Sequence, residues 1–225
     1  MDIELRFVTT ESLSKNEIDS MCRLFKIYYE ADPEFFENYE GHVRKRTHAL
    51  MVYRRGGLCG FMMLFLKPYA DYFCVGMSAL ILEHSLWGKV PLLEPLVEGI
   101  KKAAVREYGL DGTARVFVVS FAACVRTYFF NRKLLPTLVP SMECPRVPDE
   151  LRRVRDRFIA DISGKKVVDN LIDNDKYVFK FDEFSPLDEK TKSAPAFQWF
   201  LAQIGGMESY GHMDLALVTA FPNPL

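Results

Sequence analysis

The sequence predicts an α/β (α+β) protein with a mixed, mostly antiparallel central sheet flanked by helices, and with a helical insertion. Three observations predict this class. Strand-like and helix-like segments alternate along most of the chain. Paired glycines at positions 56 and 57 separate two strand-like runs, as in an antiparallel hairpin. The 225 residues are 49% hydrophobic and 26% charged, which suits one domain with a sizeable core. We therefore expect a single domain over residues 1–225.

The N-terminal part predicts an outer strand followed by helices. Residues 3–8 alternate apolar and polar side chains, which is typical of a strand with one exposed face. Residues 9–12, Thr-Thr-Glu-Ser, offer caps for the next helix. The apolar stripe of that helix recurs every three or four residues, at Ile18, Met21, Cys22, Phe25 and Tyr28 or Tyr29. Residues 33–48 predict a second, irregular helical stretch.

The middle of the chain predicts a hairpin, a long strand and a helix. Residues 48–66 indicate two strands joined at Arg-Arg-Gly-Gly, where glycine accepts the positive φ of a tight turn. Residues 72–83 are mostly apolar, as in a central strand with both faces covered. A helix over residues 90–108 carries its apolar residues on one side and ends at Gly109.

The C-terminal half predicts a strand over residues 114–121 and a helix with aromatic anchors over 122–135. Residues 136–175 break this order, because four prolines precede an amphipathic helix. We interpret this segment as an insertion. Residues 176–184 and 212–221 predict the last two strands.

Charge and hydropathy argue against two classes of partner. A net charge of −1 with a pI near 6.4 gives no electrostatic basis for nucleic-acid binding. No run of 18 apolar residues occurs, so we expect no membrane span. The first residues show no basic region followed by a long apolar run, so no signal peptide is visible. We expect a cytoplasmic protein.

Cysteines and histidines favour reduced thiols and no metal site. The five cysteines are an odd number, are scattered, and form no CxxC pattern. We interpret them as reduced thiols, with Cys144 the most exposed. The histidines stand in no metal-ligand spacing with cysteine or acidic residues; they are His42, His48, His84 and His212.

The corner between the long strand and the following helix is the strongest candidate for a binding site. A helix that begins after a strand presents unpaired N–H groups and the positive end of its dipole, which suits a phosphate or pyrophosphate. Gly88 permits close backbone approach, and Lys89 adds a positive charge. The alternative is that Gly88 only makes the turn, Lys89 is solvated and Trp87 packs in the core.

The chain resembles the GNAT superfamily of acyl-CoA-dependent N-acyltransferases in its element order over most of residues 1–135 and in this corner. The family's loop has the pattern Arg/Gln-x-x-Gly-x-Gly/Ala, and its amides hold the coenzyme A pyrophosphate. Residues 85–90, Ser-Leu-Trp-Gly-Lys-Val, match it at Gly88. Val90 and Pro91 depart from it, because Val90 is branched and Pro91 has no N–H. After the next strand, Tyr128 stands at about the place of a family tyrosine.

The resemblance implies that acetyl-CoA or another acyl-CoA is the co-substrate and that a small-molecule or peptide amine accepts the acyl group. The coenzyme would contact residues around the corner: Leu82, Trp87, Gly88, Lys89, Val90 and Leu92. A backbone N–H near Leu82 would hold the oxyanion.

Two further side chains would carry the chemistry. Glu83 stands where the family often has a carboxylate that deprotonates the amine. Alternatively, it caps the following turn or pairs with a lysine. His84 would face the opposite side, since strand side chains alternate. Tyr128 resembles the tyrosine that protonates the leaving thiolate; its alternative is a core position, because Phe129 and Phe130 adjoin it.

The sequence leaves other functions open. Val90 and Pro91 favour a non-catalytic GNAT-like module that binds a ligand or protein through a degenerate loop. A different α/β enzyme that uses another nucleotide is a third interpretation. Three aromatic residues would border the acceptor groove in the resembling family, but their spacing favours packing on the sheet; they are Phe35, Phe36 and Tyr39.

Overall fold

A computed structural model describes residues 2–86, 88–110, 114–173, 177–180, 189–210 and 212–221. The chain divides into two compact units, which we describe separately. Unit 1 comprises Met1–Val116 with Phe221–Leu225, and unit 2 comprises Phe117–Ala220.

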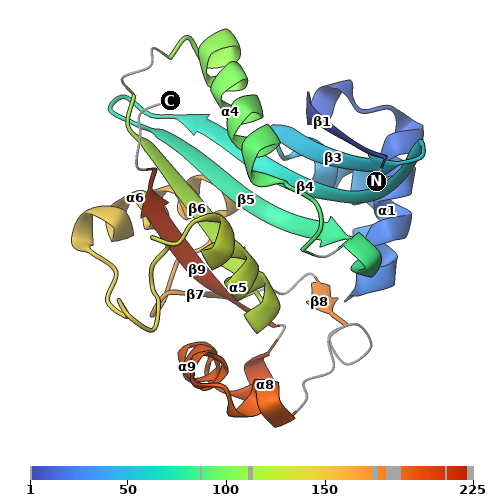
Figure 1. Ribbon diagram of the computed structural model, residues 1–225. Helices are drawn as coiled ribbons and strands as arrows, with labels where there is room; N and C mark the ends of the chain where they lie inside the picture. The colour runs from blue at the N-terminus through green and yellow to red at the C-terminus, as the bar shows by residue number, and fades with distance from the viewer. Residues whose placement is uncertain are drawn as a thin grey trace. The chain divides into compact units, whose positions relative to one another are not determined.

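The sheet of unit 1 is antiparallel and begins with the predicted outer strand (Figure 1). Its order is β1-β3-β4-β5, with β1 at Ile3–Thr9, β3 at His48–Arg54, β4 at Gly57–Pro68 and β5 at Phe73–Leu82. Arg55 (φ 52°) and Gly56 (φ 79°) form the β3–β4 turn. Two successive positive φ values are those of a type I′ turn, so the predicted hairpin is confirmed.

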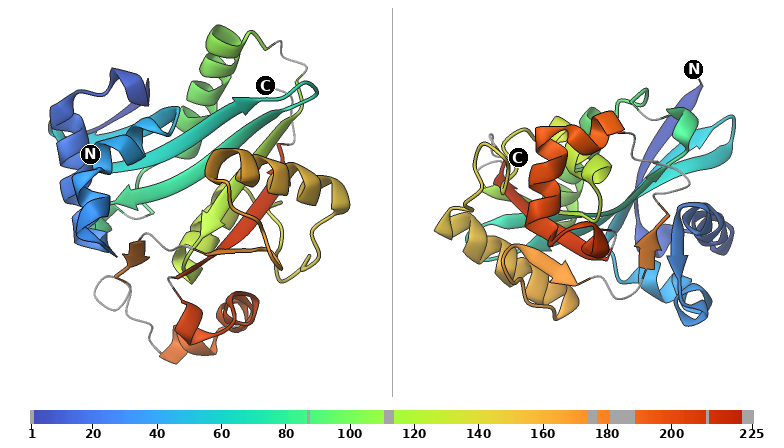
Figure 2. Two further views of the ribbon diagram at one scale, coloured as in Figure 1. Left: turned by 180° about the vertical axis from the view of Figure 1, so that it is seen from behind. Right: turned by 90° about the horizontal axis from the view of Figure 1, so that it is seen from below.

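The helices of unit 1 cover both faces of this sheet (Figure 2). Helix α1 (Lys15–Tyr28) lies on one face, where Glu17 pairs with Arg6 at 3.2 Å. Helix α4 (Leu93–Tyr108) lies on the other face, where its Gly99 packs against Phe7. Adjacent strand residues such as Arg6 and Phe7 point to opposite faces, which is why the two helices are separated by the sheet.

The start of α1 corrects one detail of the prediction. Residues Thr10–Ser12 form a short 3-10 helix, and the cap is Ser14. Ser14 and Glu17 form a reciprocal capping box, in which each side chain bonds the other residue's backbone. The predicted irregular helical stretch is present as α2 (Pro33–Glu37) and α3 (Tyr39–Arg44), which follow the short strand β2 (Tyr29–Ala31).

Strand β5 carries a bulge that the sequence did not predict. Met62 of β4 pairs with Leu80 and Met63 pairs with Ser78, which leaves Ala79 as the extra residue. Ala79 has φ 43°, a strained value for a residue with a Cβ. The extra residue bends the strand locally, and pairing with β4 resumes at Leu80 and continues to Leu82.

Unit 2 also has an antiparallel sheet with helices packed on it. Its order is β6-β9-β7, with β6 at Val116–Ala122, β9 at Met213–Ala220 and β7 at Leu171–Asp173. The helices are α5 (Val125–Leu134), α6 (Asp149–Ser163), α8 (Glu189–Ser193) and α9 (Pro195–Ile204). The short strand β8 spans Tyr177–Phe179 and the 3-10 helix η3 spans Met207–Ser209.

Most predictions for unit 2 are confirmed, and two helices were missed. The strands near 114–121 and 212–221, the helix near 122–135 and the amphipathic helix after the prolines are all present. The predicted strand over 176–184 is seen as β8, and residues 181–188 lie outside the described ranges. Helices α8 and α9 were not predicted. Residues 136–175 supply β7 and a bridge from Val139 to Val218, so they take part in the sheet.

The α/β class with a mostly antiparallel sheet and flanking helices is therefore confirmed. In the part of the chain that the structure describes, no helix has both the length and the apolarity to cross a bilayer. All five cysteines are free thiols, and Cys144 is the exposed one.

Candidate functional site

The candidate corner begins where β5 ends, at Leu82. The next backbone N–H, that of Glu83, donates to the Cys59 carbonyl of β4 at 2.8 Å. The Glu83 carbonyl accepts from Leu86 at 2.8 Å, which opens the 3-10 helix η2 (His84–Leu86). The His84 N–H donates to the Tyr28 hydroxyl of α1 at 3.2 Å. The corner is thus fixed to both β4 and α1.

This geometry corrects the expectation that Glu83 and His84 face opposite sides of a strand. Both residues lie beyond β5, and His84 belongs to η2. The alternation rule applies only to extended backbone, so it says nothing of their directions here.

The Glu83 carboxylate is paired with an arginine. Its Oε2 lies 2.7 Å from Arg54 Nη2, and Arg54 Nη1 donates to Ser85 Oγ at 3.3 Å. The two charged side chains are 38% and 35% exposed, so the pair contributes little to stability, about 0–1 kcal/mol. The alternative of an ion pair at Glu83 is observed, but the partner is Arg54 and not the lysine that was expected.

A buried phenol adjoins the same carboxylate. Burial raises the pKa of the Tyr28 hydroxyl, and the negative charge of Glu83 raises it further, while the hydrogen bond from the His84 backbone opposes the shift. Tyr28 therefore stays protonated at neutral pH and remains a hydrogen-bond partner of the corner.

Lys89 makes two hydrogen bonds within the turn that follows η2. The Lys89 N–H donates to the Leu86 carbonyl at 3.0 Å, and Lys89 Nζ donates to the Ser85 carbonyl at 2.9 Å. Gly88 has φ 70°, and no atom lies within 4 Å of the position a Cβ would take. Gly88 is thus required by the backbone conformation, and the space beside it is open. Trp87 lies outside the described residues.

The start of α4 presents few free amides. Pro91 and Pro95 have no N–H, and the Leu92 N–H donates to the Val90 carbonyl at 3.0 Å. No side chain caps the helix, and the acidic Glu94 lies in its first turn. Of the residues predicted to contact the coenzyme, Leu92 is buried and Val90 is partly buried. An anion at this corner would rely on fewer N–H groups than an unmodified helix start offers.

Leu82, the last residue of β5, lies against a glycine of β4. It pairs with Gly60, where an added Cβ would lie 2.9 Å from the Ile81 carbonyl oxygen and 3.2 Å from Leu82 Cα. Only glycine permits this close approach of the two backbones. Gly60 therefore sets the position of the strand end that leads into the corner.

Tyr128 belongs to unit 2 and lies in an aromatic cluster of that unit. Its side chain is 3% exposed. Its ring centroid lies 5.4 Å from Trp199, 5.7 Å from Phe200 and 5.7 Å from Phe129. Burial raises the pKa of its hydroxyl, while the Arg132 charge and a hydrogen bond with the Met142 backbone oppose the shift. These surroundings are those of the core alternative, and the role as a proton donor stays a prediction.

The structure brings together one part of the predicted site. The described residues at 82, 83, 88, 89, 90 and 92 form one continuous corner of unit 1, whereas Tyr128 lies in unit 2. Arg54 was missed, because its approach to Glu83 depends on the register of three strands. Phe35 and Tyr39 are buried and pack on Phe25 of helix α1, with ring centroids 5.4 and 5.6 Å apart, where packing on the sheet was expected.

Comparisons with known proteins give similarities of structure. Neither a protein-family model nor a curated protein matches the sequence. The chain is similar to an acetyltransferase of Trypanosoma brucei, with 18% identity and a TM-score of 0.42 over 66% of this chain and 99% of the other. It is similar to an IAA acetyltransferase of Bacillus cereus, with 10% identity and a TM-score of 0.44 over 98% and 100% of the two chains. A ribosomal-protein-alanine N-acetyltransferase of Brucella melitensis shows 13% identity and a TM-score of 0.39 over 65% and 96%.

Proposed function

We propose that this chain is a GNAT-like N-acyltransferase that moves an acetyl or longer acyl group from coenzyme A to an amine. The observation that supports this proposal most is the course of the chain from β5 into α4. A bulged strand ends at Leu82, a carboxylate follows at Glu83, and an open glycine turn at Gly88 leads into a long helix. This is the order in which the GNAT pattern places its acyl-CoA site.

In this proposal the corner holds the phosphates of the acyl-CoA. The open space at Gly88 lets the backbone approach a pyrophosphate closely, and Lys89 could turn its ammonium from the Ser85 carbonyl to a phosphate oxygen. Val90 and Leu92 would contribute contacts, with Trp87 as a further predicted member. The acyl-CoA would supply the activated acyl group, and the acceptor is a small-molecule or peptide amine.

The proposed roles of the side chains follow from their chemistry. Glu83 accepts a proton from the amine, and its ion pair with Arg54 holds the carboxylate in place just beyond β5. The backbone N–H of Leu82 stabilises the developing oxyanion. Tyr128 gives a proton to the departing thiolate; burial raises the pKa of its hydroxyl above the ordinary value of a phenol, so the proton is present before the transfer.

A non-catalytic module is the second candidate, and specific contacts favour it. Pro91 and Pro95 lack an N–H, and the amides of Lys89 and Leu92 are already donated. The Glu83 carboxylate is already paired with Arg54, and Tyr128 is nearly fully buried. In that function the fold would bind a ligand or a protein through another surface and would not turn over acyl-CoA.

Calorimetry on the full chain separates the two candidates. Acetyl-CoA, butyryl-CoA and palmitoyl-CoA are titrated into the protein, with free coenzyme A as the control for the contribution of the acyl group. The acyltransferase proposal expects saturable binding of at least one acyl-CoA, and tighter binding than free coenzyme A. Absence of measurable binding for all three would overturn it and favour the binding module.

A further inference from the structure

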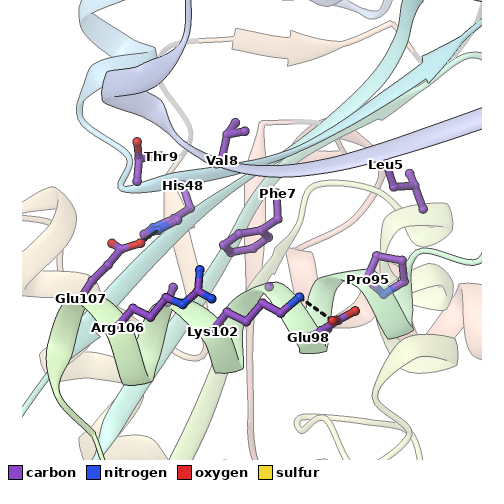
Figure 3. A pocket seen from close by; sticks show the side chains of 12 residues that line it. Leu5, Phe7, Val8, Thr9, His48, Pro95, Glu98, Lys102, Arg106 and Glu107 are labelled. Atoms are coloured by element: carbon purple, nitrogen blue, oxygen red, sulfur yellow. Dashed lines mark hydrogen bonds and ion pairs between the residues drawn. The ribbon is translucent and has the colours of Figure 1, made fainter.

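A groove on unit 1, away from the corner, runs between β1 and the side of α4 that faces β1 (Figure 3). It encloses about 390 Å³, which is within the size of small-molecule sites. Its apolar wall comes from both elements, and Figure 3 shows Phe7 pointing from β1 toward the helix. Gly99 of α4 lets this ring approach, since an added Cβ would lie 2.8 Å from Phe7 Cβ. The ring forms a flat apolar surface inside the groove.

Two charged side chains of the groove pair with each other, and a third has no ion-pair partner among the described residues. Lys102 and Glu98 pair at 2.6 Å along α4, so they neutralise each other. Arg106 extends from the same helix toward the groove (Figure 3) and forms no ion pair or hydrogen bond with the described residues. A guanidinium offers a planar fork of donors that matches a carboxylate. The groove therefore has one unengaged cation.

His48, at one end of the groove, also has an unsatisfied atom. Its side chain is 2% exposed, its ring lies 5.1 Å from that of Phe7, and its Nε2 lies 3.1 Å from Glu107 Oε1. A carboxylate only accepts hydrogen bonds, so Nε2 is the donor to Glu107 and Nδ1 is the ring nitrogen left for another partner. Nδ1 is buried and has no hydrogen-bond partner among the described residues. Buried polar atoms of this kind are rare in native proteins and point to a missing partner.

We propose that this groove binds a small carboxylate that carries a ring-sized apolar body and a hydroxyl group. The carboxylate pairs with Arg106, the apolar body lies against Phe7, and the hydroxyl donates to His48 Nδ1. Because Nδ1 is buried, binding includes a tilt of the imidazole toward the groove. The carboxylates of Glu98 and Glu107 also line the groove, so each additional negative charge on a ligand is repelled there. A singly charged carboxylate is therefore repelled less than a phosphate.

A matched set of three probes tests each part of this site by calorimetry on the full chain. Mandelate has the ring, the carboxylate and the hydroxyl; phenylacetate lacks the hydroxyl; 1-phenylethane-1,2-diol lacks the carboxylate. We expect saturable binding of mandelate, binding of phenylacetate weaker by about fivefold, and binding of the diol weaker by at least about tenfold. No saturable binding of mandelate would overturn the site. Equal affinities for mandelate and phenylacetate would overturn the contact with His48.

Two variants distinguish the site from general attraction of anions. Arg106→Ala removes the proposed partner and should weaken mandelate binding at least about tenfold. Lys101→Ala removes the same charge from an exposed position of α4 that does not line the groove, and should leave the affinity unchanged. Equal losses in the two variants would overturn the proposal. These titrations contain no acyl-CoA, so their outcome is independent of the proposed transferase activity.

Discussion

The corner at residues 82–92 and the groove between β1 and α4 adjoin the same helix, but they differ in how their charges are satisfied. At the corner, Glu83 pairs with Arg54 and Lys89 bonds the Ser85 carbonyl. In the groove, Arg106 and one nitrogen of His48 have no partner in the part of the chain that the structure describes. The polar groups of the corner, which the sequence predicts as an anion site, are thus engaged by neighbouring residues, whereas these two groups of the groove are not.

The largest expected effect tests whether Glu83 is a catalytic base although its carboxylate is paired with Arg54. Glu83→Gln keeps the shape of the side chain but removes its ability to accept a proton. If Glu83 is the base, turnover of acyl-CoA with an identified amine should fall by about 10²-fold. Coenzyme affinity should stay nearly constant, because the loss concerns the transition state. Steady-state kinetics of thiol release measure both quantities.

The control for this variant is Glu11→Gln, which removes one carboxylate from an exposed position of η1 (Thr10–Ser12). It should leave turnover unchanged. Full turnover in Glu83→Gln would show that the carboxylate only fixes the corner through Arg54.

The second prediction concerns Gly60, which sets the position of the strand end that leads into the corner. Gly60→Val places a branched side chain where the Ile81 carbonyl lies 2.9 Å from the Cβ position, and backbone atoms cannot move aside cheaply. We expect the free energy of unfolding to fall by about 2 kcal/mol. Urea denaturation followed by circular dichroism measures it. In Gly57→Val of the same strand the nearest atom is 3.6 Å away, so the change should stay within about 0.5 kcal/mol. Equal changes in the two variants would contradict the role given to Gly60.

Local sequence signals were sufficient for most of the fold. The hairpin was predicted from the paired Gly56 and Gly57, but the positive φ values fall on Arg55 and Gly56, and Gly57 already belongs to β4. Ser14 was missed as a cap although Ser-x-x-Glu is present at 14–17, because Thr9 to Ser12 offered competing caps. Helix α9 was also readable, since Pro195 stands at its first position and Gly205 follows its end with φ 86°.

The chemistry of the site was less predictable, because it depends on contacts between distant residues. Glu83 was correctly expected near a basic partner, but Arg54 meets it only through the pairing of β3, β4 and β5. The contact of His48 with Glu107 joins residues 59 positions apart and depends on where α4 lies on the sheet. No local sequence pattern predicts such pairs, and none predicts the bulge at Ala79.

The third prediction tests the packing beneath the groove. Gly99→Ala should improve helix propensity by about 1 kcal/mol. The added methyl group, however, overlaps the Phe7 ring, and such overpacking costs about 2 kcal/mol. The net result should be a loss of about 1 kcal/mol in the free energy of unfolding, measured by urea denaturation. Lys101→Ala on the exposed side of α4 is the control and should be near neutral. Higher stability in Gly99→Ala would show that Phe7 moves freely and that the wall of the groove is not fixed.

The smallest expected effect tests whether Lys89 binds a phosphate of acyl-CoA or only stabilises the turn. The ammonium now donates to the Ser85 carbonyl at 2.9 Å, so moving it to a phosphate exchanges one hydrogen bond for another. Lys89→Ala should therefore weaken acetyl-CoA binding only about threefold, as expected for a partly solvated charge pair. Because salt screens such pairs, the difference between wild type and variant should shrink as the ionic strength rises from 0.05 to about 0.5 M. Calorimetry at both salt concentrations measures it, with Lys101→Ala as the control for net charge. A loss equal to that in Lys101→Ala would mean that Lys89 keeps its hydrogen bond to the Ser85 carbonyl and stabilises only the turn.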